Sequence, residues 1–275
     1  MNKFIIAIFI LLVTQLNLKA NIINVPGNYT TIQAAINASA NGDTVLVEAG
    51  TYFENINFRG KQIVLTSRFY ITHDPATIWA TVINGSTPLQ PDSASCVIFN
   101  SHEDSTTVLQ GFTITGGTGT KWQDENGPGR YREGGGILVA LSSPVIQFNI
   151  IHNNRVTDLT GVVSTGGGGI RAGDSYQRIY NNIIMNNTGR YGAGLVLNYA
   201  GGEIKNNIIC VNYGSQSYGA GSGIWLNGSF SSPKYIVNNS IVFNSSLNGA
   251  PGVYGLASTQ SNLINNIWRT RDENI

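Results

Sequence analysis

Short apolar runs flanked by asparagines recur along the second half of the chain. The five segments are FNIIHNN (Phe148–Asn154), YNNIIMNN (Tyr180–Asn187), NNIICVN (Asn206–Asn212), NNSIVFN (Asn238–Asn244) and INNIW (Ile264–Trp268). A glycine followed by an aliphatic residue opens each copy, at Gly136, Gly169, Gly194, Gly223 and Gly255. The copies recur about every 25 to 33 residues, a repeat length typical of solenoid proteins.

Alternation within each copy predicts short strands rather than helices. In GIRA, GLVL and GIWL the first aliphatic residue faces one side, and the next residue (Arg171, Val196 or Trp225) faces the other. A second strand holds Ile146, Ile179, Ile204 and Ile236, and a third holds Ile151, Ile184, Ile209 and Ile241. Three short strands per repeat with bends between them predict an all-β parallel β-helix.

Asparagine occupies two fixed columns in this alignment. The first column is Asn149, Asn182, Asn207, Asn239 and Asn266, and the second is Asn154, Asn187, Asn212 and Asn244. Asparagine tolerates the left-handed backbone conformation of a sharp bend, and its amide can bond the equivalent amide one coil away. We therefore expect both columns to be structural ladders rather than ligand sites.

The N-terminal segment predicts a cap for the solenoid. Thr30 and Gln33 have the spacing of a capping box that opens a short helix, and Gly42 can end it. Ile32 and Ile36 share one face of this helix, which we expect to cover the apolar end of the first coil.

The cap and the repeats together resemble a known superfamily. The elements TIQAA, GDTV and GTYxE, followed by LQGFTITGG and the GGGI and NNII coils, are similar to the pectin-lyase-like superfamily of secreted bacterial proteins. The resemblance implies a right-handed parallel β-helix of about seven coils over residues 43–275, capped by residues 21–42. It implies no particular activity, because this fold carries lyases, hydrolases, esterases, epimerases and adhesive proteins.

The remaining composition bears on location. Residues 1–20 have a basic start, a short apolar core and a small residue at Ala20, which predicts a secretory signal peptide and a secreted or cell-surface protein. No later segment is long and apolar enough to predict a membrane span. The net charge of +1 without a basic cluster argues against nucleic-acid binding. The chain ends in RTRDENI, without a cap, sorting or anchoring motif, which is typical of a solenoid truncated at its C-terminus.

The two cysteines are expected to be buried thiols. Cys96 and Cys210 fall about three coils apart in the alignment, and adjacent strands are about 4.8 Å apart. That separation is too long for a disulfide.

No catalytic motif is evident in the repeats. A lyase of this fold needs grouped acids for calcium and an Arg or Lys as base, but the column of Asp174 holds Ser142 and Tyr199 in the adjacent coils. The paired aspartates of galacturonan hydrolases and esterases are not found either. We assign no catalytic residue, no metal site and no cofactor from the sequence.

One insertion breaks the repeat and is the candidate site. TGTKWQDENGPGRYRE (Thr118–Glu133) is rich in charged and aromatic residues and leads into the strand at Gly136. The candidate ligand-binding residues are Trp122, Arg130 and Arg132 of the insertion and Arg171 and Trp225 of the outward column of the coils. Aromatic rings stack on sugars and arginines pair with uronate carboxylates. The alternative is a solvated loop over an ordinary mixed face.

Two classes of function follow. The first is a secreted, non-catalytic protein that binds extracellular polysaccharide or serves adhesion, and the missing catalytic column favours it. The second is an enzyme acting on an acidic glycan, as a lyase or hydrolase. An acidic cluster with an Arg or Lys within about 6 Å on the strand face would favour the enzyme.

Overall fold

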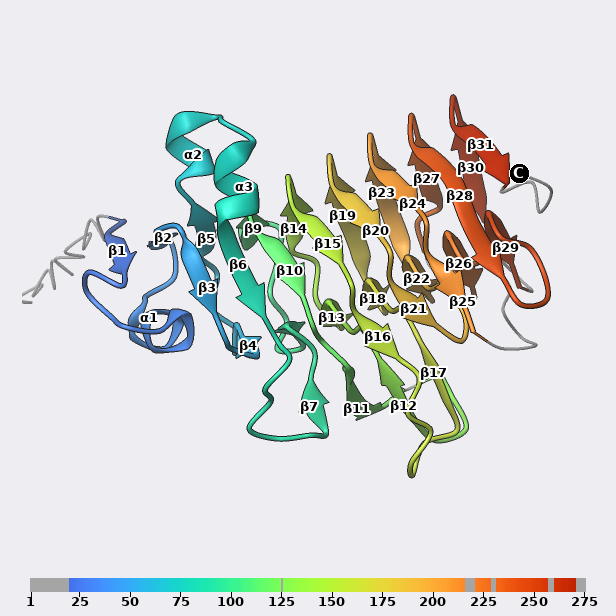
Figure 1. The fold of residues 1–275 in the computed structure, drawn as a ribbon, viewed down its shortest axis with the longest axis horizontal. Coiled ribbons are helices and arrows are strands. Elements are labelled where there is room, and N and C mark those ends of the chain that lie inside the picture. The colour runs from blue at the N-terminus through green and yellow to red at the C-terminus, as the bar shows by residue number, and fades with distance from the viewer. Residues whose placement is uncertain (1–19, 125, 216–220, 229–230, 257–259, 271–275) are drawn as a thin grey trace, which may run out of the picture.

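The computed structural model describes residues 20–124, 126–215, 221–228, 231–256 and 260–270. Apart from Ala20, the predicted signal peptide lies outside these residues. Strands of successive turns stack side by side along one axis, and their parallel sheets form an elongated solenoid (Figure 1). The fold is the parallel β-helix that the repeat predicts. The described residues contain no helix long and apolar enough to span a bilayer.

The sheets follow the predicted strands of each turn. Within the described ranges, the first sheet has nine parallel strands: β1 (Ile22–Val25), β2 (Thr44–Val47), β5 (Val64–Ser67), β9 (Val108–Gln110), β14 (Val145–Gln147), β19 (Tyr176–Tyr180), β23 (Gly201–Lys205), β27 (Lys234–Val237) and β30 (Ser261–Ile264). The second has seven: β4 (Ile56–Asn57), β8 (Val97–Phe99), β13 (Ile137–Ala140), β18 (Ile170–Gly173), β22 (Leu195–Asn198), β26 (Ile224–Asn227) and β29 (Val253–Gly255). The seven strands of this second sheet agree with the prediction of about seven coils.

The third sheet contains a strand column that the repeat did not predict. The main column of this sheet, which the repeat did predict, contains β3 (Gly50–Tyr52), β6 (Thr81–Asn84), β10 (Thr113–Thr115), β15 (Ile150–His152), β20 (Ile183–Met185), β24 (Ile208–Cys210), β28 (Ser240–Ser246) and β31 (Ile267–Thr270). The long strand β28 joins it to the extra column, which consists of β16 (Arg155–Val156), β21 (Thr188–Gly189) and β25 (Tyr213–Gly214). Each later coil therefore has a fourth short strand after its second asparagine.

The core consists of aliphatic columns in exact register between coils. Ile146, Ile179, Ile204 and Ile236 pair one above another, and all four are fully buried. Burying one such side chain stabilises the fold by about 1.5 to 3 kcal/mol. Equivalent isoleucines from neighbouring turns thus hold the coils together.

The glycine column is set by close contact between coils. A Cβ atom on Gly169 would lie 2.5 Å from the carbonyl oxygen of Gly194, so only glycine fits. The predicted fifth member, Gly255, is wrong. Ile224 pairs with Val253, and this register places Gly252 next to Gly223.

The first asparagine column forms the predicted ladder. Asn182 donates from its backbone N–H and from Nδ2 to Oδ1 of Asn207, over 2.9 and 3.1 Å. Its Nδ2 also donates to the carbonyl of Ile146 in the preceding coil, and the Asn182 side chain is buried. The same contacts repeat along Asn149, Asn182, Asn207, Asn239 and Asn266, and along the second ladder of Asn154, Asn187, Asn212 and Asn244.

The ladder asparagines do not make the bends, contrary to our expectation. The left-handed residue is the one before each ladder asparagine, such as Asn181 (φ 55°) before Asn182. At this bend position most coils have asparagine, whereas Phe148, Val211 and Phe243 adopt the same φ without it. The asparagine pairs therefore divide two tasks, the first residue turning the backbone and the second bonding to the next coil.

The N-terminal helix α1 (Ile32–Ala38) covers the end of the coil stack as predicted. Ile32 and Ile36 are fully buried, and α1 contacts β1 and β2. The N-cap is Thr31 rather than Thr30, and its side chain accepts from Ala34 N–H. Glu54, from the GTYxE element, accepts from the N–H groups of Ile32 and Gln33 over 2.8 and 2.9 Å. This carboxylate ties the helix to the first coil.

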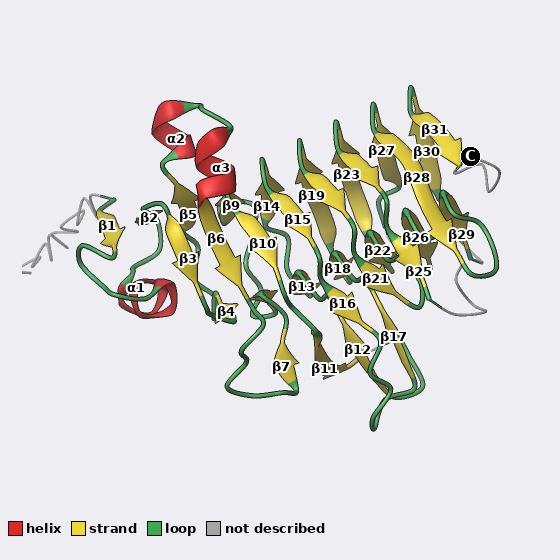
Figure 2. Cartoon of the chain, in the orientation of Figure 1, coloured by secondary structure: helices red, strands yellow, loops and turns green. Residues whose placement is uncertain are grey.

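Two short helices and a small sheet complete the described structure. The helices α2 (Phe69–Thr72) and α3 (Ala76–Ala80) follow β5, and Figure 2 shows the helices gathered toward the N-terminal half. The small sheet consists of β7 (Ser93–Ala94), β11 (Gly119–Gln123), β12 (Arg130–Glu133) and β17 (Ser164–Gly166). Both cysteines are free, as predicted, but Cys210 is only partly buried.

Candidate functional site

The insertion folds as an antiparallel hairpin rather than a solvated loop. β11 pairs with β12 from Thr120–Glu133 to Gln123–Arg130, and β12 pairs in parallel with β17. The hairpin lies beside the coils of β13 and β18 (Figure 1) and contacts β13. The hairpin and β17 thus build one wall against the second sheet.

This wall buries the column predicted to face outward. Leu138, Arg171 and Val196 occur at equivalent positions of successive coils, as predicted, but each is at most 1% exposed. Trp225, in the next coil, is only half-buried. The prediction of an exposed Arg171 is therefore wrong, because the hairpin covers it.

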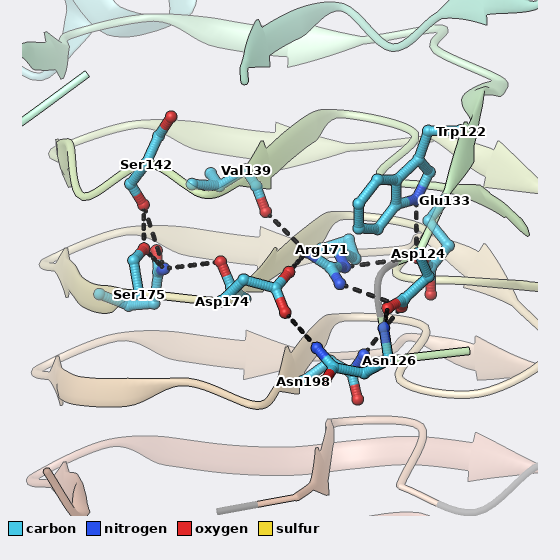
Figure 3. A network of polar contacts seen from close by, with 12 residues as sticks. Trp122, Asp124, Asn126, Glu133, Val139, Ser142, Arg171, Asp174, Ser175 and Asn198 are labelled. Atoms are coloured by element: carbon cyan, nitrogen blue, oxygen red, sulfur yellow. Dashed lines mark hydrogen bonds and ion pairs between the residues drawn. The ribbon is translucent and has the colours of Figure 1, made fainter. Parts of the chain in front are cut away.

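Arg171 lies at the centre of a cluster of three carboxylates (Figure 3). Its Nη2 is 3.2 Å from Asp124 Oδ2, its Nη1 is 3.0 Å from Asp174 Oδ2, and its Nε is 3.3 Å from Glu133 Oε2. Nη1 also donates to the carbonyl of Val139. The guanidinium carbon lies 4.2 Å from the centroid of the Trp122 ring. All three carboxylate side chains are at most 5% exposed.

Neutral donors complete the cluster. Tyr191 OH donates to Glu133 Oε1 over 2.6 Å, and Trp122 Nε1 donates to Glu133 Oε2 over 3.0 Å. Asn198 Nδ2 donates to Asp124 Oδ2 over 2.9 Å. Buried charges need such bonds because they have lost their water.

Burial and charge shift the pKa values in this cluster. Burial raises the pKa of Glu133 above its ordinary value, against the opposing effects of Arg171 and of the hydrogen bonds from Tyr191 and Trp122. Burial lowers the pKa of Arg171, but Glu133, Asp174 and Asp124 outweigh it, so that pKa is raised. Burial and the neighbouring Glu133 raise the pKa of Tyr191 well above its ordinary value. Arg171 is therefore held as a cation and is unsuited to take a proton.

An open groove lies next to the cluster. Its volume is about 640 Å³, and Tyr131, Tyr191, Trp225 and Tyr254 supply aromatic side chains to its lining. Trp225 and Tyr254 pair in register on adjacent coils, and the rings of Tyr191 and Trp225 are 4.8 Å apart between centroids. The groove wall therefore carries aromatic side chains from adjacent coils and, at Tyr131, from the hairpin.

A small polar recess adjoins the groove. It has a volume of about 60 Å³ and shares Tyr131, Tyr191, Trp225 and Asn227 with the groove lining. Its remaining lining includes Asp124, Glu133 and Asn198. Asp124 and Glu133 thus both contact Arg171 and line the recess.

The predicted site residues separate into three places. Trp122 and Arg171 lie in the buried cluster, and Trp225 lies in the groove wall. Arg130 is exposed on β12. Arg132 is buried and bonds to the carbonyl of Pro91 and to Asp92 Oδ1, each over 2.8 Å. Arg132 therefore anchors the hairpin to the loop before β7.

Sequence reasoning missed the acidic cluster. Asp124, Glu133 and Asp174 belong to no single coil column, so an alignment of repeats does not bring them together. The available signal was the concentration of acidic residues in the insertion, one coil before the strand of Arg171. The cluster meets the distance criterion stated for an enzyme, but its arginine is enclosed by its own carboxylates.

In the described part of the chain, no group of three or more His, Cys, Asp or Glu side chains is arranged to hold a metal ion. Comparison of the chain with family models, with curated proteins and with solved structures found no match. The groove and recess are therefore the candidate functional site on structural grounds.

Proposed function

We propose that this protein is a secreted or cell-surface β-helix that binds an extracellular polysaccharide in the aromatic groove. The observation that carries the proposal is the wall of Tyr131, Tyr191, Trp225 and Tyr254 along a groove of about 640 Å³. Ligand sites combine such apolar surfaces with a few placed polar groups. A sugar ring has the matching character, with apolar C–H faces and polar hydroxyl edges.

The register of the aromatic residues suits an extended chain. Trp225 and Tyr254 belong to adjacent coils, and coils are about 4.8 Å apart. A saccharide lying along the coil stack would meet successive aromatic rings from successive turns. The signal-peptide pattern at residues 1–20 and the cap and repeat motifs of the pectin-lyase-like superfamily support an extracellular role of this kind.

A hydrolase is the second candidate. Glu133 and Asp124 both line the recess, and burial raises the pKa of Glu133, as a general acid requires. A glycosidase of this kind would release new reducing ends. The lyase alternative has less support, because the guanidinium nearest these acids is enclosed by three carboxylates.

The test is retention on immobilised glycans. We expect the full chain to be retained on at least one member of a panel of neutral, amino and acidic polysaccharides. Trp225→Ala and Tyr254→Ala should each weaken retention at least about tenfold, because the aromatic wall is interrupted. Trp79→Ala is the matched control, since Trp79 is 52% exposed on α3 and does not line the groove.

Two results would count against binding in the groove. One is retention that Trp225→Ala and Trp79→Ala reduce equally. The other is no retention on any glycan of the panel. Release of reducing ends that Glu133→Gln abolishes would instead establish the hydrolase.

A further inference from the structure

We propose that the recess selects a protonated amine, so that the glycan bound in the groove is an amino sugar rather than a uronic acid. The inference rests on the proposed function and adds the substrate class. It reverses the expectation that arginines of the insertion and of the outward column pair with uronate carboxylates. Arg171 is fully buried and occupied by its three carboxylates.

The first argument is charge. Three carboxylates contact one guanidinium in the cluster, and two of them, Asp124 and Glu133, line the recess. Arg190 lines the groove but is not part of the recess lining. A uronate carboxylate entering the recess would meet like charges, whereas an ammonium group would meet opposite ones.

The second argument is the direction of the hydrogen bonds. The hydroxyl hydrogen of Tyr191 already points at Glu133, and Asn198 Nδ2 points at Asp124. Asn227 Nδ2 in turn donates to Asn198 Oδ1 over 2.8 Å. These three donors of the lining are thus directed at acceptors of the lining, and Asn126 Nδ2, also of the lining, donates to Asp174 Oδ1 over 2.7 Å. Each ionised carboxylate has about four acceptor positions, so Asp124 and Glu133 can accept further hydrogen bonds. An ammonium group brings three donors and no acceptor.

The third argument is size and walls. A volume of about 60 Å³ admits one small substituent, and the sugar ring itself has to remain in the groove. Tyr131, Tyr191 and Trp225 border both spaces, so the substituent passes aromatic rings on its way to the acids. Aromatic faces attract cations, most strongly where water is excluded. An amine on a sugar ring stacked against Trp225 is small enough for the recess and lies close to aromatic faces.

The test compares four tetrasaccharides by calorimetry with the full chain. They are β-1,4-linked glucosamine, its N-acetylated form, β-1,4-linked glucose and α-1,4-linked galacturonate. We expect glucosamine tetrasaccharide to bind at least about tenfold more tightly than the other three. The glucose tetrasaccharide is the sharpest comparison, because it keeps the backbone and replaces the ammonium group with an uncharged hydroxyl of similar size; the N-acetylated form also loses the charge but gains an acetyl group.

Two variants locate the selectivity in the recess. Asn227→Lys brings a competing ammonium group into it and should reduce glucosamine binding at least about tenfold, and by a larger factor than it reduces glucose binding. Asn262→Lys adds the same charge at an exposed site on β30 and should change neither. Asp124→Asn keeps the side-chain shape and leaves Arg171 with two carboxylates, and it should also reduce the preference for glucosamine.

The outcomes separate the inference from the proposed function. Equal binding of all four tetrasaccharides, lost in Trp225→Ala, would overturn the amine preference and leave the groove intact. Tighter binding of galacturonate, or a preference that survives both Asn227→Lys and Asp124→Asn, would also overturn it. A lysine tetrapeptide that binds as tightly as glucosamine would overturn the sugar assignment. Binding unaffected by Trp225→Ala would remove the groove itself.

Discussion

Arg171 and Asp124 are 47 positions apart in the chain, yet Arg171 Nη2 lies 3.2 Å from Asp124 Oδ2. The arginine belongs to a coil strand and the aspartate to the hairpin inserted between coils. Their contact, with the one between Arg171 and Glu133, fixes the hairpin against the second sheet (Figure 3). The same contact gives the recess its acidic border.

Replacement of Arg171 should destabilise the protein strongly. Arg171→Ala leaves three carboxylates buried without their cation, and such losses cost about 3 to 5 kcal/mol. Urea unfolding measures the effect, and Arg130→Ala, at an exposed position of the hairpin, should change the free energy of unfolding by less than about 0.5 kcal/mol. Equal, small effects of both replacements would show that the cluster does not hold the hairpin.

The asparagine ladder should contribute measurably to stability. Asn182→Ala removes the amide between Asn149 and Asn207 and leaves buried donors without acceptors, which should cost about 1 to 3 kcal/mol. The matched control is Asn262→Ala, at an exposed position of β30. Indistinguishable unfolding free energies for the two variants would refute the ladder.

The bend before each ladder residue offers a stabilising substitution. Val211 adopts φ 56° although it is β-branched, and its side chain is 49% exposed. Most equivalent positions have asparagine, which tolerates this region. Val211→Asn should therefore stabilise the protein by about 1 kcal/mol in urea unfolding. Leu89→Asn replaces an exposed aliphatic residue outside a left-handed bend and should be neutral. A destabilised Val211→Asn variant would contradict the division of tasks within the asparagine pairs.

Glu133 should make stability fall with rising pH. The pKa of Glu133 in the folded protein is raised above 4.5, so the folded state retains this proton to higher pH than the unfolded state. Its contribution is fully present below about pH 4.5 and is lost as the pH rises through the folded pKa. Glu133→Gln should lack this decline.

Unfolding free energies measured in steps from pH 4 upward provide the check. The informative quantity is the slope with pH, since the substitution also changes the absolute stability. Parallel pH profiles for the parent and Glu133→Gln would mean that Glu133 titrates normally.

The coil architecture was determined by the sequence alone. The isoleucine, glycine and ladder asparagine positions recur in each repeat. The pattern within one repeat therefore predicts its strands and bends, and the neighbouring repeats show the same pattern. The capping helix was also predicted from the sequence, because Ile32 and Ile36 share a helical face. Small errors in register, at Gly255 and Thr30, arose where a loop length changed or two similar residues stood side by side.

The site was decided only by the tertiary structure. The hairpin has no periodic counterpart, and its place depends on pairings such as Glu133 with Thr120 and with Gly166. Strand alternation placed Arg171 on the outward side of its coil. Because of these long-range contacts, Arg171 is instead a buried ion with Asp124 beside it. Strand alternation gives the side of the sheet on which a residue lies, whereas burial depends on what packs over that side. Here a second, non-repeating segment packs over it, and it forms both the recess and part of the groove wall.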